Sequence, residues 1–180
     1  VIGLDDQAII DACAQAQNDD VVAAVNFNSP GQVVIAGHKA AVERAGVLCK
    51  EAGAKRVLPL PVSVPSHCAL MSDAADKLAA DLEGITFNAA MINIVNNVDV
   101  SIETTSEAIK AALVKQLYSP VRWSETITKL GDEGITQMVE VGPGKVLQGL
   151  VKRINKSINC VSFNTEDTLI KEKELTQENK

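Results

Sequence analysis

The sequence predicts a mixed α/β protein. Short apolar runs with strand-like character are separated by segments whose apolar side chains recur every three or four residues, as in amphipathic helices. Turns that contain proline or glycine mark most of the boundaries between these segments. With 180 residues and 46% apolar content, the chain can bury roughly 70% of its unfolded surface in a packed core.

The first 62 residues predict a small sheet with two helices. The expected elements, in order, are a strand end at 1–4, a helix capped by Asp5 or Asp6, strands at 21–28 and 32–37, a helix at 38–53 and an extended run at 55–64. Pro30 and Gly31 suit a type II turn, so the two middle strands should form an antiparallel hairpin. The order strand, helix, strand, strand, helix, strand is that of the ferredoxin-like split pattern.

From residue 66 onward, longer helices alternate with short apolar strands. Expected helices lie at 72–82, with Ser72 as the N-cap, and at 104–117, 123–134 and 146–154, and expected strands at 92–100, 136–141 and 159–163. Strands separated by helices suggest a parallel sheet. The charged tail from residue 165 to 180 reads as a frayed final helix.

Composition excludes several classes of protein. The four cysteines form no Cys-x-x-Cys pair, so they read as reduced thiols of a cytoplasmic protein without a metal site. A net charge of -6 argues against nucleic acid as the main partner, and no apolar stretch is long enough to span a membrane. Because the chain begins with Val1 inside an apparent strand, we expect it to be part of something longer.

His67 is the first candidate for chemistry. It follows a proline-punctuated extended run, and an imidazole is the side chain best suited to proton transfer at neutral pH. A half-buried histidine that only caps a strand or helix would look the same by spacing. The second histidine, His38, lies at the polar entry to a helix and reads as a capping or solvated residue.

Three further groups are candidates. Gln116 falls in the apolar stripe of its helix, so either its amide has a buried partner or the last turn is exposed. Asn26 and Asn28 share a strand face beside the turn, where they are either paired site residues or simple turn-flanking polar residues. The Gly142-Pro143-Gly144-Lys145 turn could offer N–H groups to an anion, although it lacks the spacing of a P-loop.

The sequence contains no partner for a basic histidine to activate. A Gly-x-Ser-x-Gly nucleophile elbow is absent from the 180 residues. Cys68 is adjacent to His67, but sequence neighbours usually point apart, so a Cys–His pair is not expected.

Five ordered blocks resemble a known family. The segments VNFNSPGQVVIAGH, AGAKRVLPLPVSVPSHCALM, FNAAMINIVNNVDV, VKQLYSPVRW and EVGPGKVLQGLVKRI closely resemble the malonyl-CoA:acyl carrier protein transacylases of bacterial fatty acid synthesis. The resemblance implies a ferredoxin-like small subdomain at residues 1–61. It assigns residues 62–180 to the C-terminal part of an α/β-hydrolase-like acyltransferase domain.

The resemblance also implies site residues. His67 falls on the catalytic histidine, and Gln116 on the residue whose carbonyl oxygen orients it. Asn26 and Asn28 match positions that line the cleft for CoA and phosphopantetheine, and Ser66 belongs to the region that tunes acyl choice. The basic pair Lys55-Arg56 matches a pair near the phosphates.

The implied reaction moves malonyl from malonyl-CoA to the acyl carrier protein thiol through a seryl ester. CoA and phosphopantetheine are then substrates, with no cofactor or metal, and neither nucleic acid nor membrane is a partner. The N-terminal segment that holds the serine, the malonyl-binding arginine and an oxyanion-hole glutamine is missing here, so we expect this piece alone to be inactive and to need that segment.

Two other functions stay open. A polyketide-type acyltransferase would carry a different acyl group, and a non-catalytic ferredoxin-like binding module could account for residues 1–62. Acyl carrier proteins are acidic, so docking on this acidic chain would need a local basic surface. The candidates for that surface are Lys55, Arg56, Lys152, Arg153 and Lys156.

Overall fold

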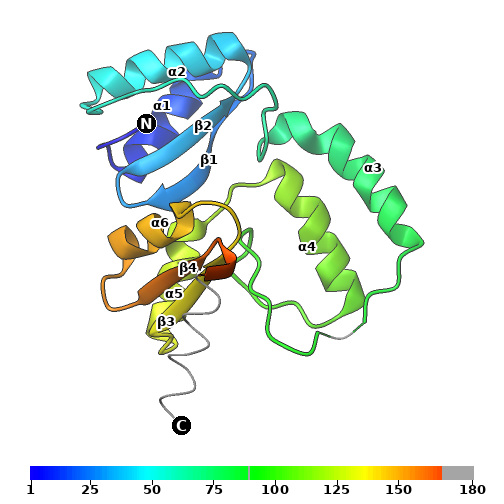
Figure 1. Ribbon diagram of the computed structural model, residues 1–180. Coiled ribbons are helices and arrows are strands. Elements are labelled where there is room, and N and C mark those ends of the chain that lie inside the picture. Colours follow the sequence, from blue (N-terminus) through cyan, green and yellow to red (C-terminus); the bar gives the residue numbers. More distant parts are fainter. Residues whose placement is uncertain (89, 168–180) are drawn as a thin grey trace. The chain divides into compact units, whose positions relative to one another are not determined.

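The computed structural model describes residues 1–88 and 90–167, and it has the mixed α/β character that the sequence predicts (Figure 1). The elements in chain order are α1 (Asp6–Ala16), β1 (Val22–Ser29), β2 (Gln32–Gly37), α2 (Lys39–Glu51), the 3-10 helix η1 (Ala69–Met71), α3 (Ser72–Glu83), α4 (Ser106–Tyr118), α5 (Trp123–Asp132), β3 (Gln137–Val141), α6 (Val146–Ile154) and β4 (Asn159–Phe163). The chain divides into two units, residues 1–126 and 127–180. The predicted domain boundary at residue 61 stays a prediction.

The core of the first unit lies between the β1–β2 hairpin and helices α1 and α2. Helix α1 buries Ile9, Ala12, Cys13 and Ala16, which recur every three or four residues, and Asp5 caps the helix by accepting a hydrogen bond from the Gln7 N–H. The buried cluster consists of Ile9, Ala12, Cys13, Ala16, Val22, Ala24, Val33, Ala41, Ala45 and Cys49. Burial raises the pKa of the Cys13 thiol to about 12, so this cysteine stays protonated in the fold.

The hairpin forms as predicted. Strands β1 and β2 pair antiparallel, and Gly31 in the turn between them has a φ of 69°, which glycine adopts without steric cost. Ile2 lies beside this hairpin and bridges antiparallel to both Gln32 and Arg56. The chain start therefore lies between β2 and the segment that follows α2.

One predicted strand is wrong: the segment at 92–100 has a bridge between Val95 and Ile102 in place of a strand. The extended run at 55–64 pairs only at Arg56, since its prolines at positions 59 and 61 cannot donate to a ladder. Beyond the half-buried Val57, its apolar side chains Leu58, Leu60, Val62 and Val64 are exposed. Ser72 is the first residue of α3 and not its N-cap, which is Met71.

Helices α3 and α4 lie side by side in the first unit (Figure 1). Thr105 caps α4 by accepting a hydrogen bond from the Ala108 N–H at 3.2 Å. At its other end α4 stops at Tyr118, because Ser119 has an extended conformation and precedes Pro120. This helix end is where the candidate site lies.

The second unit contains a two-stranded parallel sheet. Strands β3 and β4 pair in register from Gln137–Asn159 to Val141–Phe163, as the alternation of strands and helices predicts. Helix α6 connects the two strands and carries the buried Leu150 and Val151. The part of the predicted tail helix beyond residue 167 lies outside the described residues.

Candidate functional site: a histidine at the end of a helix

His67 makes two hydrogen bonds to the C-terminal end of α4. Its ring nitrogen Nδ1 lies 2.7 Å from the main-chain oxygen of Gln116, and its backbone N–H donates to the oxygen of Leu117 at 2.9 Å. His67 is half-buried and has a φ of 66°, in the left-handed region that residues other than glycine seldom adopt. Both bonds hold this unusual backbone conformation in place.

The end of α4 can accept these bonds because its last carbonyl groups have no partner within the helix. The helix stops before Pro120, so no following turn donates N–H groups to the oxygens of Gln116 and Leu117. The same carbonyls form the negative end of the helix dipole, equivalent to about half an elementary charge. The site thus combines two accepting oxygens with a negative potential.

The hydrogen bond to Gln116 fixes the tautomer of the neutral imidazole. A carbonyl oxygen only accepts hydrogen bonds, so Nδ1 must carry the proton. The other ring nitrogen, Nε2, is then left with a lone pair that can accept a proton.

The side chain of Gln116 is not buried, although its place in the apolar stripe of the helix suggested that it could be. Gln116 is exposed, so the expectation of a buried amide with an internal partner is wrong, and the alternative of an exposed last turn is right. The group that reaches His67 is the main-chain carbonyl of Gln116.

The two residues beside His67 point elsewhere. Cys68 is 2% exposed, and its Sγ donates to the oxygen of Pro65 at 3.2 Å, so the structure contains no Cys68–His67 pair. The backbone N–H of Ser66 donates to the oxygen of Val64 at 2.9 Å, which leaves Ser66 half-buried next to the histidine.

The segment after α4 pairs with the free edge of β1. Val121 donates its N–H to the oxygen of Val25 at 2.8 Å and accepts from the N–H of Phe27 at 3.0 Å, which makes a parallel bridge to Asn26. The end of α4 that binds His67 is therefore joined to β1 by the short segment up to Val121. Asn26 and His67 lie in the same unit.

Asn26 and Asn28 are both half-buried. Register shifts fall between Ala24 and Asn26 and between Phe27 and Ser29, so the strict alternation behind the predicted shared face is interrupted. The structure therefore brings Asn26 close to the α4 connection but does not by itself pair the two amides.

The basic residues Lys55 and Arg56 are exposed, and the stem of Lys55 covers Gly3, where an added Cβ would lie 2.6 Å from the lysine Cγ. In the second unit, Lys145, Lys152 and Lys156 line an open groove of about 600 Å³. Cys160 lines the same groove, and burial, with a smaller contribution from Glu140, raises the pKa of its thiol.

The first turn of α6, which follows the glycine-rich turn, donates to an internal carboxylate. The carboxylate of Glu140 accepts hydrogen bonds from the N–H groups of Leu147 at 3.1 Å and Gln148 at 2.8 Å. An anion bound near this turn would therefore have to compete with Glu140 for these two N–H groups of α6. Within residues 1–88 and 90–167, no three His, Cys, Asp or Glu side chains gather as metal ligands.

Sequence reasoning missed three residues that build the site. Leu117 contributes a main-chain oxygen, Pro120 ends the helix, and Val121 joins it to β1. The Ser119-Pro120 dipeptide was the available signal, because a residue before proline disfavours helix and so leaves carbonyls without partners. No pattern in the sequence points to Val121.

The chain belongs to the acyl transferase domain family, whose profile matches residues 3–178. Among its relatives is the malonyl CoA-acyl carrier protein transacylase of Haemophilus influenzae, 63% identical over 164 residues, which cover 91% of this chain and 53% of the relative. The enzyme of the same description from Escherichia coli strain K12 is 58% identical over 175 residues, covering 97% of this chain and 57% of the relative. The chain thus spans about half the length of these curated relatives.

Solved structures agree with this assignment. An acyl carrier protein S-malonyltransferase from Vibrio cholerae superposes with a TM-score of 0.92 at 61% identity, over 93% of this chain and 55% of the other. A malonyl-transacylase solved in complex with a type II PKS acyl-carrier protein gives a TM-score of 0.93 at 58% identity, over 94% and 55% of the two chains. None of the helices in the described residues is long and apolar enough to cross a membrane.

Proposed function

We propose that the protein carrying this chain transfers malonyl from malonyl-CoA to the phosphopantetheine thiol of an acyl carrier protein. The observation that carries the proposal is the geometry of His67, whose Nδ1–H is held by a main-chain carbonyl while Nε2 is left to accept a proton. Relatives at 63% and 58% identity that are named malonyl CoA-acyl carrier protein transacylases support the substrate assignment.

In this mechanism His67 is the general base. Its Nε2 takes the proton of a serine hydroxyl, and the serine oxygen attacks the thioester carbonyl of malonyl-CoA to form a seryl ester. The departing CoA sulfur then receives the proton from the imidazolium. In the second half, Nε2 takes the proton of the carrier protein thiol, which attacks the ester, and the serine oxygen regains a proton as it leaves. The serine would come from the part of the family's length outside these 180 residues.

The α4 terminus takes the place of a triad carboxylate in this proposal. The carbonyl of Gln116 orients the ring, and the negative end of the helix dipole stabilises the imidazolium between the two proton transfers. Asn26, Asn28 and Ser66 are proposed to line the cleft for the CoA and phosphopantetheine chains. The bridge between Asn26 and Val121 supports this arrangement, because it ties β1 to the connection that follows the His67 acceptor.

The finer fold assignments belong to the same proposal. We infer a ferredoxin-like small subdomain at residues 1–61, supported by Ile2, which bridges antiparallel to both Gln32 and Arg56. These bridges give the strand order expected of that topology, with the first strand between the third and the fourth. Residues 62–180 would be part of an α/β-hydrolase-like domain, completed by the rest of a cytoplasmic enzyme.

The acyl group is tested by comparing transfer rates from malonyl-CoA and methylmalonyl-CoA in the protein at full family length. We expect malonyl to be preferred, although one methyl group in a pocket is worth only about 1–3 kcal/mol of discrimination. Equal rates would contradict the malonyl assignment. They would favour the polyketide-type alternative, in which the enzyme carries a different acyl group.

Lys55 and Arg56 are predicted to contribute to docking of the carrier protein or of the CoA phosphates. Reversing both charges in Lys55→Glu/Arg56→Glu should raise the KM for one of these substrates and leave kcat unchanged, because exposed charges act on encounter more than on chemistry. A matched reversal at Lys152 and Lys156, which line the groove beside α6, tests the other basic surface. Unchanged KM values for both substrates would remove the altered pair from the interface.

A further inference from the structure

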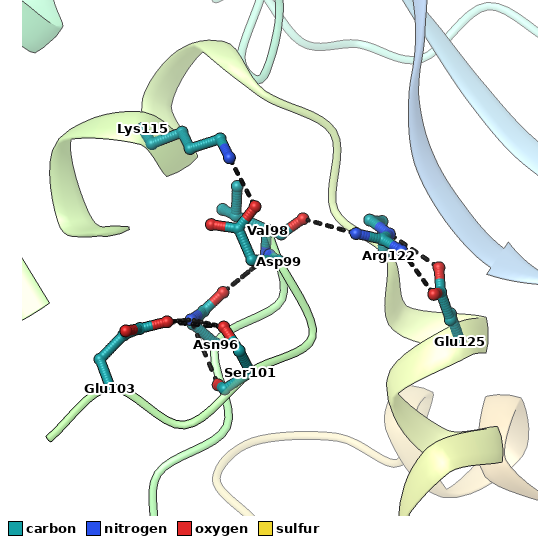
Figure 2. A network of polar contacts seen from close by, with 8 residues as sticks. All are labelled: Asn96, Val98, Asp99, Ser101, Glu103, Lys115, Arg122 and Glu125. Carbon is teal, nitrogen blue, oxygen red and sulfur yellow. Dashed lines mark hydrogen bonds and ion pairs between the residues drawn. The ribbon is translucent and has the colours of Figure 1, made fainter. Parts of the chain in front are cut away.

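The side chain of Asn96 makes the hydrogen bonds that shape a loop between α3 and α4, and this loop contacts the C-terminal part of α4. In the Asn96 loop (residues 96–101), Asn96 Oδ1 accepts hydrogen bonds from the N–H groups of Val98 at 3.1 Å and Asp99 at 2.8 Å (Figure 2). This is the local competition by which an asparagine side chain replaces a strand ladder with a turn. It explains why the predicted strand at 92–100 does not form.

The amide nitrogen of Asn96 closes the other side of the loop. Its Nδ2 donates to the oxygen and the Oγ of Ser101 at 3.2 and 3.1 Å, and to Oε1 of Glu103 at 3.3 Å. Ser101 Oγ also donates to Glu103 Oε1 at 2.6 Å. The Asn96 side chain therefore acts as both donor and acceptor, which an uncharged amide can do and a carboxylate cannot.

The loop is held in a strained conformation. Val100 has a φ of 54°, which is unfavourable for a β-branched residue, and its side chain is only 6% exposed. Such a backbone persists when the surrounding structure over-determines it, and strain of this kind gathers at functional sites. His67 is another non-glycine residue in the left-handed region, and it binds the helix end that the loop contacts.

The Asn96 loop contacts the chain on both sides of the His67 acceptor (Figure 2). Asp99 pairs with Lys115, the residue just before Gln116 in α4. After the helix, the N–H of Arg122 donates to the oxygen of Asn97 at 2.9 Å, and its guanidinium donates to the oxygen of Val98 at 3.3 Å. The Asn96 loop thus contacts both ends of the segment from Lys115 to Arg122, which contains Gln116.

We propose that Asn96 is a positioning residue for the His67–Gln116 hydrogen bond. By holding the Asn96 loop in its strained form, it places Asp99 against Lys115 and Asn97 against Arg122, and so fixes the carbonyl that orients the imidazole. The expected effect of Asn96 on the transfer rate rests on the proposed function. The expected effect of Asn96 on the geometry of His67 does not depend on that function.

The test uses the protein at full family length and the Asn96→Asp variant. An aspartate keeps the acceptor bonds to the N–H groups of Val98 and Asp99 but loses the donor and sets a second carboxylate against Glu103. The double variant Asn96→Asp/Glu103→Gln exchanges donor and acceptor and restores the bond between positions 96 and 103. Thr105→Ala is the matched control, since it removes a cap at the opposite end of the same helix.

Two readouts separate positioning from general stability. The first is the NMR signal of the His67 Nδ1–H proton, which reports the hydrogen bond to Gln116 directly. The second is the split between kcat and KM for malonyl transfer. For Asn96→Asp we expect a weakened Nδ1–H signal and a fall in kcat of about 10- to 100-fold with KM unchanged, since misplacement by about 1 Å costs up to 10²-fold. The double variant should restore most of both.

Other outcomes overturn the inference. If Asn96→Asp lowers the melting temperature but keeps a wild-type Nδ1–H signal, the Asn96 loop stabilises the fold without positioning His67. An equal loss of the signal in Thr105→Ala would assign the effect to α4 as a whole. If His67→Ala retains full malonyl transfer, the proposed function fails, and the Nδ1–H signal in Asn96→Asp still decides whether Asn96 positions the ring.

Discussion

His67→Ala should lower kcat for malonyl transfer by about 10²- to 10⁴-fold in the protein at full family length, the usual worth of a positioned general base. The variant removes the ring whose Nδ1 is bound to the main-chain oxygen of Gln116 at 2.7 Å, and with it the Nε2 lone pair. The fold should persist, because His67 is half-buried and lies outside the buried apolar cluster. A steady-state transfer assay, with the melting temperature recorded alongside, measures this effect.

The matched control is Gln116→Ala. Because the contacting group is the main-chain carbonyl and the side chain is exposed, this change should stay within about 0.5 kcal/mol, or roughly twofold in rate. A loss in Gln116→Ala as large as that in His67→Ala would mean that the amide side chain, and not the backbone, orients the histidine.

Gly37→Ala should reduce the free energy of unfolding by about 3–5 kcal/mol, among the larger effects of single substitutions. Gly37 ends β2 with a φ of 155°, and an added Cβ would lie 2.0 Å from the backbone oxygen of Val21. The same oxygen accepts the N–H of His38 at 2.7 Å, so relieving the clash would also break this hydrogen bond. Urea unfolding of the two proteins measures the difference.

Gly84→Ala serves as the control for that measurement. Gly84 follows α3 with a φ of -79°, and no atom lies within 4 Å of a Cβ built there, so its stability should change by less than about 0.5 kcal/mol. If Gly37→Ala unfolds at the same urea concentration as the wild type, the close approach of the two strands at this point does not exist in solution.

The helices and the hairpin could be predicted because local signals and tertiary packing agree there. In α1, the cap at Asp5 and the stripe that includes Ile9 and Cys13 both indicate the helix that the structure contains. At 92–100, by contrast, the apolar alternation favours a strand, but the Asn96 side chain takes the N–H groups that a ladder would need. A pattern of apolar residues contains no information about this competition for hydrogen bonds.

The candidate site could be predicted only in part for a related reason. A side chain that can transfer protons at neutral pH, such as His67, is easily recognised in the sequence. Its partner is a main-chain oxygen, which every residue has, so the identity of residue 116 carries little information about the contact. The position of that oxygen depends on the helix stop at Pro120 and on the pairing of Val121 with β1, which only the fold reveals.

The contact between His67 and Gln116 joins residues 49 positions apart, which has a consequence for synthesis on the ribosome. Translation adds about 5–20 residues per second, so His67 is made roughly 2–10 seconds before its acceptor. During that interval neither hydrogen bond to α4 can hold the left-handed backbone at His67. The nascent chain can fold the β1–β2 hairpin with α1 and α2 first, and His67 can bind the Gln116 oxygen only after α4 has emerged and ended before Pro120.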